Sequence, residues 1–294
     1  MLVAWKYKER DTIIQRLDPR ARWIFLFAMT FSIIQFWDIR FLFFFFVISF
    51  TQYFLCKLTW KETRRVWTFI LILVIVIIGF NALLTGRGGP GEVLQGDKHI
   101  LWEVKIVIPW VGWTIRPNIT VEKVVFAVTQ WVRMLGITVL FIPLAFTFNP
   151  SEYGITFRRL GLPDKLAVTM DLSFRFVPTL ARDFGITLDS QRARGYEIEK
   201  LEGGLFAQIR KTAPLIVPVT INSIVGAEDI VNAMDLRCFG LRKRTWLREL
   251  HYRTRDYVLI GAAILMLAAS CTFNWVLGMG SFWTPDWIFS FFGF

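Results

Sequence analysis

The sequence of 294 residues is 54% hydrophobic and 19% charged, with a net charge of +11, and it includes 29 Phe and 13 Trp. Long apolar runs with tryptophan near their ends are typical of a membrane protein and exclude an ordinary soluble domain. The positive charge does not indicate a nucleic-acid partner, because the basic residues lie in segments that alternate with apolar runs. Three isolated cysteines and two distant histidines predict neither a disulfide framework nor a metal site.

Five apolar runs predict membrane-spanning helices. A helix needs about 20 apolar residues to cross a hydrocarbon core of about 30 Å. The runs at 66–85, 124–148 and 257–279 reach this length, whereas the runs at 23–37 and 41–56 are shorter and are interpreted as a helical hairpin. We therefore expect an all-α membrane protein with about five transmembrane helices.

A break in the apolar pattern at residues 86–122 separates the third and fourth predicted spans. Glycine and proline are frequent in this segment, and residues 102–115 alternate weakly between apolar and polar side chains. We interpret it as an extended or interfacial insert outside the cell. Its glycine-rich part, residues 86–92, lacks the Gly-Lys-Ser/Thr of a phosphate-binding loop, so nucleotide binding is not predicted.

Arg133 lies inside the fourth predicted span, about 18 Å along the helix from Val121. A charge at this depth is costly, so we expect Arg133 to face the bundle interior, a partner or water. Two interpretations stay open. Arg133 is either a polar contact in a transport path, or it forms a structural hydrogen bond to backbone carbonyls or to a group such as Asn81.

The distribution of basic residues predicts the orientation of the chain. Residues 1–22 carry six Lys/Arg and residues 57–65 carry four, whereas residues 38–40 carry one and the longer stretch 86–123 carries five. The positive-inside rule then places the N-terminus in the cytoplasm. We expect an N-terminal transmembrane region, a cytoplasmic helical region with long coupling helices, and a C-terminal span with its tail, at residues 1–148, 149–255 and 256–294.

The cytoplasmic region is predicted to consist of long helices with arginine at their ends. Asn149–Glu152 suits a helix start, with Asn at the N-cap, Pro at the first position and Glu at the third. Apolar residues recur every three or four positions in Leu166–Gly195, which predicts an amphipathic helix along the membrane boundary that ends at its glycine. A second, largely apolar stretch ends in Met234-Asp235-Leu236-Arg237, and Gly240 offers a helix end three residues later.

Several motifs occur in order along the chain: Arg16–Arg20 (RLDPR), Asn149–Glu152 (NPSE), Arg159–Leu166 (RLGLPDKL), Arg175–Leu180 (RFVPTL) and Ala193-Arg194-Gly195. Their order and spacing resemble those of one family, the transmembrane T component of energy-coupling factor (ECF) transporters. These transporters import vitamins and metals in bacteria and archaea. The resemblance covers about three quarters of the chain.

The resemblance implies two docking sites for ATPases. In that family each arginine signature ends a coupling helix that docks on one of two cytoplasmic ABC-type ATPase subunits. By position, Ala193, Arg194 and Gly195 would dock one ATPase, and the other would be docked by Leu236, Arg237 and Cys238. The second tripeptide departs from the small residues usual in the family. A guanidinium group at a helix end suits both sites, because it can form bidentate, charge-assisted hydrogen bonds to an acidic groove.

The resemblance also implies the role of the whole chain. It would be a non-catalytic permease subunit in a prokaryotic plasma membrane, coupling ATP-driven motion of the ATPases to a separate substrate-binding membrane subunit, the S component. The imported substrate would be a vitamin, a vitamin precursor or a transition-metal ion. ATP and Mg²⁺ would be bound by the ATPases, so no cofactor is expected on this chain. The lipid bilayer, but no nucleic acid, is an expected partner.

Two other classes of protein are weighed against this interpretation. A polytopic membrane enzyme acting on an interfacial or lipid-linked substrate should show paired carboxylates or a nucleophile with a base near a span end. The nearby carboxylates are explained by a solvated helix face: Asp183, Asp189, Glu197, Glu199 and Glu202. A channel or secondary transporter should carry polar residues or inverted repeats within the spans, and Arg133 alone meets this requirement.

Overall fold

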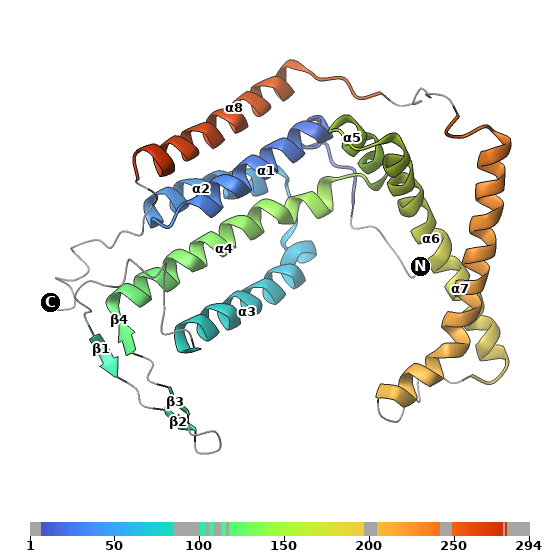
Figure 1. The fold of residues 1–294 in the computed structure, drawn as a ribbon, viewed down its shortest axis with the longest axis horizontal. Helices are drawn as coiled ribbons and strands as arrows, with labels where there is room; N and C mark the ends of the chain where they lie inside the picture. The colour runs from blue at the N-terminus through green and yellow to red at the C-terminus, as the bar shows by residue number, and fades with distance from the viewer. Residues whose placement is uncertain are drawn as a thin grey trace. The chain divides into compact units, whose positions relative to one another are not determined.

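The computed structural model describes residues 7–84, 100–103, 106–108, 113–115, 118–196, 205–241, 249–278 and 280 (Figure 1). The chain forms two compact units. The bundle unit comprises Lys8–Phe148 and Tyr252–Phe294, and the long-helix unit comprises Met1–Tyr7 and Asn149–His251.

The bundle unit is built from apolar helices close to the predicted spans. Their bounds are α1 Pro19–Gln35, α2 Ile39–Leu55, α3 Trp60–Leu84, α4 Val121–Thr147 and α8 Thr254–Cys271, the last extended by a π-helical turn, η2, at Thr272–Val276. Within the described residues, Val124–Thr147 and Thr254–Val276 are long and apolar enough to cross a membrane, and Ile39–Leu55 is a shorter apolar helix. Thr212–Leu236, which lies in the region predicted to be cytoplasmic, also meets this criterion by length and composition.

Two hydrophobic clusters hold the bundle together, and α4 contributes to both. The first joins α1, α2, α4 and α8 around Met29, Ile33 and Leu140. The second joins α2 and α4 to the start of α3 around Tyr53 and Phe146. Because α2 and α4 both contribute to two clusters, they link α3 to the rest of the bundle.

Four short strands occur in the insert between α3 and α4, where extended backbone was predicted, and the other elements among the described residues are helices. β1 (Ile100–Glu103) pairs antiparallel with β4 (Asn118–Thr120), and β2 (Ile106–Ile108) pairs antiparallel with β3 (Trp113–Ile115). The weak alternation of apolar and polar residues already favoured extended backbone here. The glycine-rich part, residues 86–92, lies outside the described residues.

α1 and α4 run antiparallel, and an arginine of each helix donates a hydrogen bond to a carbonyl at the C-terminal end of the other. Arg22 near the start of α1 donates from NH1 to the carbonyl of Thr147, the last residue of α4, at 3.3 Å. Arg133 of α4 donates from NH2 to the carbonyl of Phe36, the C-cap residue of α1. Both contacts satisfy carbonyls that have no intrahelical donor and carry the negative end of the helix dipole.

The long-helix unit begins as predicted. The Asn149 Oδ1 accepts a hydrogen bond from the backbone N–H of Ser151 at 3.1 Å, and the first turn, η1 (Pro150–Glu152), is a 3₁₀ turn rather than an α-helix. α5 (Tyr153–Arg159) follows and packs closely on α6 (Asp164–Ala193). At Gly154 a Cβ would lie 2.7 Å from the carbonyl oxygen of Ala167, so this approach of α5 to α6 requires glycine.

α6 packs against α7 (Leu205–Leu236) within the same unit. The side chain of Gln191, near the end of α6, donates to the carbonyl of Pro214 in α7 at 3.3 Å. The two helices cross in Figure 1 so that their C-terminal ends lie at opposite ends of the pair. Few side chains of the pair are buried: in the described part, Ala167 of α6 and Leu215 of α7 are.

Candidate docking site

The C-terminal end of α6 has a defined backbone geometry. Arg194 is the C-cap residue, and Gly195 after it adopts φ +84°. The backbone N–H of Gly195 donates to the carbonyl of Arg192 at 2.9 Å, and that of Tyr196 donates to the carbonyl of Gln191 at 3.0 Å. These two bonds form a Schellman motif, which satisfies carbonyls of the last turn. The predicted position of Gly195, directly after the C-cap, is confirmed.

The C-terminal end of α7 repeats this geometry. The backbone N–H of Cys238 donates to the carbonyl of Asp235 at 2.8 Å, and that of Phe239 donates to the carbonyl of Met234 at 3.0 Å. Arg237 therefore occupies the same C-cap position as Arg194 does in α6. The two arginine signatures, which differ in sequence, have the same backbone structure.

α7 ends at Leu236, within the predicted end Met234-Asp235-Leu236-Arg237, and not at Gly240, the alternative three residues later. Cys238 adopts φ +57°, the left-handed conformation that a helix end usually gives to glycine. The helix ends there because the two Schellman hydrogen bonds form at Cys238 and Phe239, two residues before the chain reaches Gly240. A left-handed conformation costs a non-glycine residue about 1–2 kcal/mol, so α7 ends in a strained turn.

Both arginines and their neighbours are exposed to solvent. Arg194 and Gly195 at one end, and Arg237 and Cys238 at the other, lie in the exposed class. Leu236, next to Arg237, is 87% exposed. Each helix end thus presents a guanidinium group that a partner can approach, placed at the negative end of the helix dipole.

The RLDPR motif has a structural role at the start of α1. The carboxylate of Asp18 caps α1 and accepts hydrogen bonds from the side chain of Arg20 at 2.8 and 3.0 Å, and both residues are buried. The backbone N–H of Asp18 donates to Asp256 Oδ1 at 2.8 Å, and the Arg20 guanidinium lies 3.7 Å from the centroid of the Tyr252 ring. The motif therefore joins the start of α1 to the start of α8.

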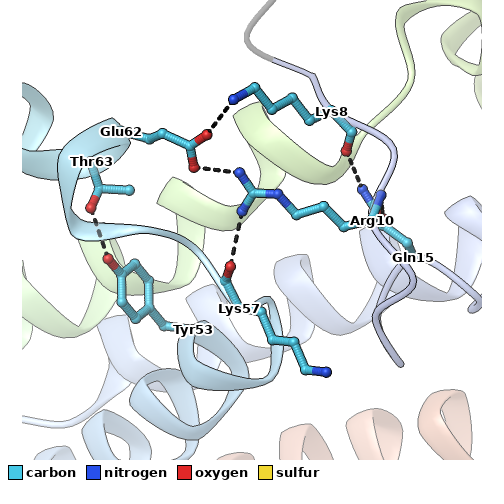
Figure 2. Close-up of polar contacts among 7 residues, drawn as sticks. All are labelled: Lys8, Arg10, Gln15, Tyr53, Lys57, Glu62 and Thr63. Atoms are coloured by element: carbon cyan, nitrogen blue, oxygen red, sulfur yellow. Dashed lines mark hydrogen bonds and ion pairs between the residues drawn. The ribbon is translucent and has the colours of Figure 1, made fainter.

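A second polar cluster, which the sequence did not predict, holds the segment before α1 (Figure 2). Glu62 in the first turn of α3 accepts from Lys8 at 2.8 Å and from Arg10, which also donates to the carbonyl of Lys57 at 3.0 Å. These two cations lower the pKa of Glu62 to about 2. Lys8 and Arg10 lie more than 50 positions before Glu62, so no local motif indicates this cluster. The one signal in the sequence is that Glu62 is an acidic residue within a basic segment.

The structure places Arg133 in the interior of the bundle. It is 7% exposed, donates to the carbonyl of Phe36, and lies with its Cζ 4.0 Å from the centroid of the Trp37 ring. A hydrogen bond to a backbone carbonyl is therefore present, as one of the two interpretations required. The side chain of Asn81, the other partner considered for Arg133, lies outside the side chains that the structure describes. No group of three or more metal-ligating side chains occurs in the part of the chain that the structure describes.

The apolar bundle, together with long helices that end in exposed arginines, defines a helical membrane protein. Residues 10–247 match the family CbiQ, described as cobalt transport protein. The chain belongs to this family.

Several relatives are named energy-coupling factor transporter transmembrane protein EcfT. The protein of Bacillus selenitireducens is 24% identical over 91% of this chain and 95% of its own length. That of Staphylococcus aureus is 26% identical over 87% of this chain and 91% of its own. A putative ABC transporter ATP-binding protein of Bifidobacterium longum is 31% identical over 52% of this chain and 20% of its own length.

Proposed function

We propose that this chain is the coupling scaffold of an ECF-type importer, in which Arg194 and Arg237 each dock one ABC-type ATPase subunit. ATP and Mg²⁺ are bound by those subunits, and ATP hydrolysis takes place there. Their motion passes through α6 and α7 to a substrate-binding membrane subunit, which releases a vitamin, a vitamin precursor or a transition-metal ion into the cell.

The observation that carries this proposal is the equivalence of the two helix ends. Two segments of different sequence hold an arginine at the same C-cap position, with the same pair of hydrogen bonds and with exposed neighbours. Because the backbone is already fixed, only the arginine side chain has to be ordered on docking, which lowers the entropic cost of docking. Two equivalent ends suit two equivalent partners.

The comparisons support the choice of partner. The Bifidobacterium relative is named as an ATP-binding protein of an ABC transporter, and a segment similar to this chain occupies 20% of it. In that protein the similar segment and the remainder are covalently joined. We infer that this chain associates with ATPases of that kind through the two arginine ends.

We place the N-terminus in the cytoplasm, so that α6 and α7 meet the ATPases on the same side. The basic residues before α1 and at residues 57–65, from the end of α2 to the first turns of α3, support this orientation. The membrane-length apolar stretch Thr212–Leu236 has little buried surface, so we propose that it lies along the bilayer boundary and contacts the substrate-binding subunit.

The test is affinity purification of the full-length chain from its own membranes in mild detergent, with quantitative mass spectrometry of the proteins that accompany it. We expect two ATPase subunits and a small apolar membrane protein. Arg194→Ala and Arg237→Ala should each weaken binding of one ATPase. Arginine residues central to an interface cost about 2–4 kcal/mol when truncated, so each loss should be at least thirtyfold. The double variant should lose both.

The matched control is Arg192→Ala. Arg192 lies two residues before Arg194, is exposed, and pairs with Asp189 in its own helix at 3.7 Å. It should leave the ATPases bound, because its charge is directed along the helix surface. A chain that keeps both ATPases in the double variant, or loses them equally in the control, would rule out docking through the two arginine ends.

A further inference from the structure

Two prolines interrupt the backbone hydrogen bonds of α7. Pro214 and Pro218 both lie inside this helix, and we call the turn between them the proline break of α7. A proline has no N–H, so the carbonyl four residues before it lacks the donor that an α-helix normally supplies. The carbonyl that Pro218 leaves without this donor is that of Pro214. Such a carbonyl needs a hydrogen bond from outside its own helix.

A side chain of the neighbouring helix provides this hydrogen bond. The Nε2 of Gln191, near the end of α6, donates to the carbonyl of Pro214 at 3.3 Å. An amide side chain suits the position, because it offers N–H donors to a carbonyl without bringing a charge that needs its own partner. The contact therefore joins α6 to α7 at the proline break.

Gln191 also belongs to the turn that carries Arg194. Its backbone carbonyl accepts from the N–H of Arg194 at 3.0 Å and from that of Tyr196 at 3.0 Å. The bond from Tyr196 is one of the two Schellman bonds that end α6. One residue thus holds the C-terminal turn of α6 through its carbonyl and the middle of α7 through its side chain.

The rest of α7 has little to fix it in place. Among its described residues Leu215, which directly follows Pro214, is the one in the buried class. A helix with so little buried surface depends more on directed contacts for its position. The hydrogen bond from Gln191 is therefore a substantial part of what orients α7 against α6.

The contact treats the two arginine ends differently. Arg194 follows Gln191 within one turn, whereas about 33 Å of helix separate Pro214 from Leu236 at the end of α7. Sharp bends in helices occur mostly at proline. A change in the bend of α7 at Pro218 would displace the carbonyl that Gln191 holds, and that displacement would reach Arg194 directly.

We propose that Gln191 is a positioning residue, which ties the turn of Arg194 to the proline break of α7 and passes a change in the bend of α7 to Arg194. The consequence for a docked ATPase rests on the function proposed above, but the link between the helices does not. Under that function, the ATPase docked at Arg194 responds to the conformation of α7.

Hydrogen–deuterium exchange of the full-length chain, without ATPases, tests the link at the amides of Gly195 and Tyr196. Gln191→Met keeps an unbranched side chain of similar helix propensity but removes the donor, and it should accelerate exchange at both amides about two- to fivefold. Pro218→Ala supplies an N–H within α7 that competes with Gln191 for the carbonyl. It should accelerate the same two amides of α6, although it slows exchange in α7 itself.

The combination of the two substitutions distinguishes a link from two local effects. Both remove the same contact, so exchange in the double variant should be no faster than in the faster single variant. Pro214→Ala is the matched control, because it replaces the other proline of α7 but leaves position 218 without an N–H. It should leave exchange at Gly195 and Tyr196 unchanged. Effects that multiply in the double variant, or equal acceleration by Pro214→Ala and Pro218→Ala, would overturn the link.

ATPase binding tests the consequence. The ATPase that is lost in Arg194→Ala should bind at least about twofold more weakly to Gln191→Met and to Pro218→Ala, because a less fixed turn has to be ordered on docking. Pro214→Ala should bind it normally. Unchanged binding to both variants would overturn the transmission to Arg194. If Arg194→Ala itself kept both ATPases, the docking function would fail, while the exchange experiment would still decide whether the helices are linked.

Discussion

Substitutions at the C-terminal ends of α6 and α7 are expected to change stability in opposite directions. At Gly195, with φ +84°, an added Cβ would meet no atom within 4 Å, so backbone strain of about 1–2 kcal/mol is the main cost of Gly195→Ala. At Cys238 that strain is already present, and Cys238→Gly removes it. Glycine loses an additional 0.5–1 kcal/mol or so of backbone entropy on folding, which leaves a net stabilisation of about 0.5–1 kcal/mol.

Hydrogen–deuterium exchange with mass spectrometry measures this locally in the full-length chain. The relevant amides are those of Gly195 and Tyr196 at the end of α6, and of Cys238 and Phe239 at the end of α7, because they form the Schellman bonds. Alanine avoids the roughly 0.5–1 kcal/mol of backbone entropy that glycine loses on folding, so the net cost of Gly195→Ala is about 0.5–1 kcal/mol. If exchange follows local opening, Gly195→Ala should accelerate it about 2–5-fold, whereas Cys238→Gly should slow it about 2–5-fold.

Gly226→Ala provides the control. Gly226 lies inside α7, has no positive φ, and would also accept a Cβ without a contact within 4 Å. The same chemical change should therefore stabilise α7 there by about 0.5–1 kcal/mol. If Gly226→Ala and Gly195→Ala had effects of the same sign, or if Cys238→Gly accelerated exchange, the assignment of backbone strain to these helix ends would be refuted.

Three further predictions concern the bundle. The pKa of Glu62 is lowered from 4.5 to about 2, so its stabilising effect is complete above pH 4.5 and is lost as the pH falls toward 2. Glu62→Gln should therefore reduce the change of the unfolding temperature with pH in this range. An unchanged pH dependence would contradict the cluster. Arg20→Met leaves the carboxylate of Asp18 buried without its partner, at a cost of about 3–5 kcal/mol seen as a lower unfolding temperature; Asp18→Asn added to it should recover part of the loss. Arg133→Met leaves the carbonyl of Phe36 without this donor and should cost about 1–3 kcal/mol; Arg133→Lys should cost less, and an equal loss would argue against the hydrogen bond.

Features that depend on near neighbours in the chain could be predicted from the sequence. Asn149 caps its helix and Gly195 follows its C-cap, because both depend on hydrogen bonds within one turn. Apolar run length located the helices of the bundle to within a few residues. The tripeptides that carry the proposed docking role were found by resemblance, and their shared backbone geometry became visible only in the structure.

Features that depend on distant parts of the chain could not be predicted. The pairing of Asp18 with Asp256 joins residues 238 positions apart, and nothing in either local sequence indicates the other. Propensity favours glycine in left-handed conformations and so points to Gly240, whereas the hydrogen bonds at the end of α7 place Cys238, two residues earlier, in that conformation. In each case the sequence shows the residue type but not the hydrogen-bond partner on which the local structure depends.

The reciprocal arginine contacts of α1 and α4 restrict how force can pass through the bundle. Phe36 lies 14 residues after Arg22, and Thr147 lies 14 residues after Arg133, so both contacts measure the same length of helix. Sliding one helix along the other by a single residue, about 1.5 Å, would pull both guanidinium groups off their carbonyls at once. Tilting the two helices together disturbs neither contact. A conformational change of this protein should therefore move α1 and α4 as one rigid strut, with the displacement taken up at its ends.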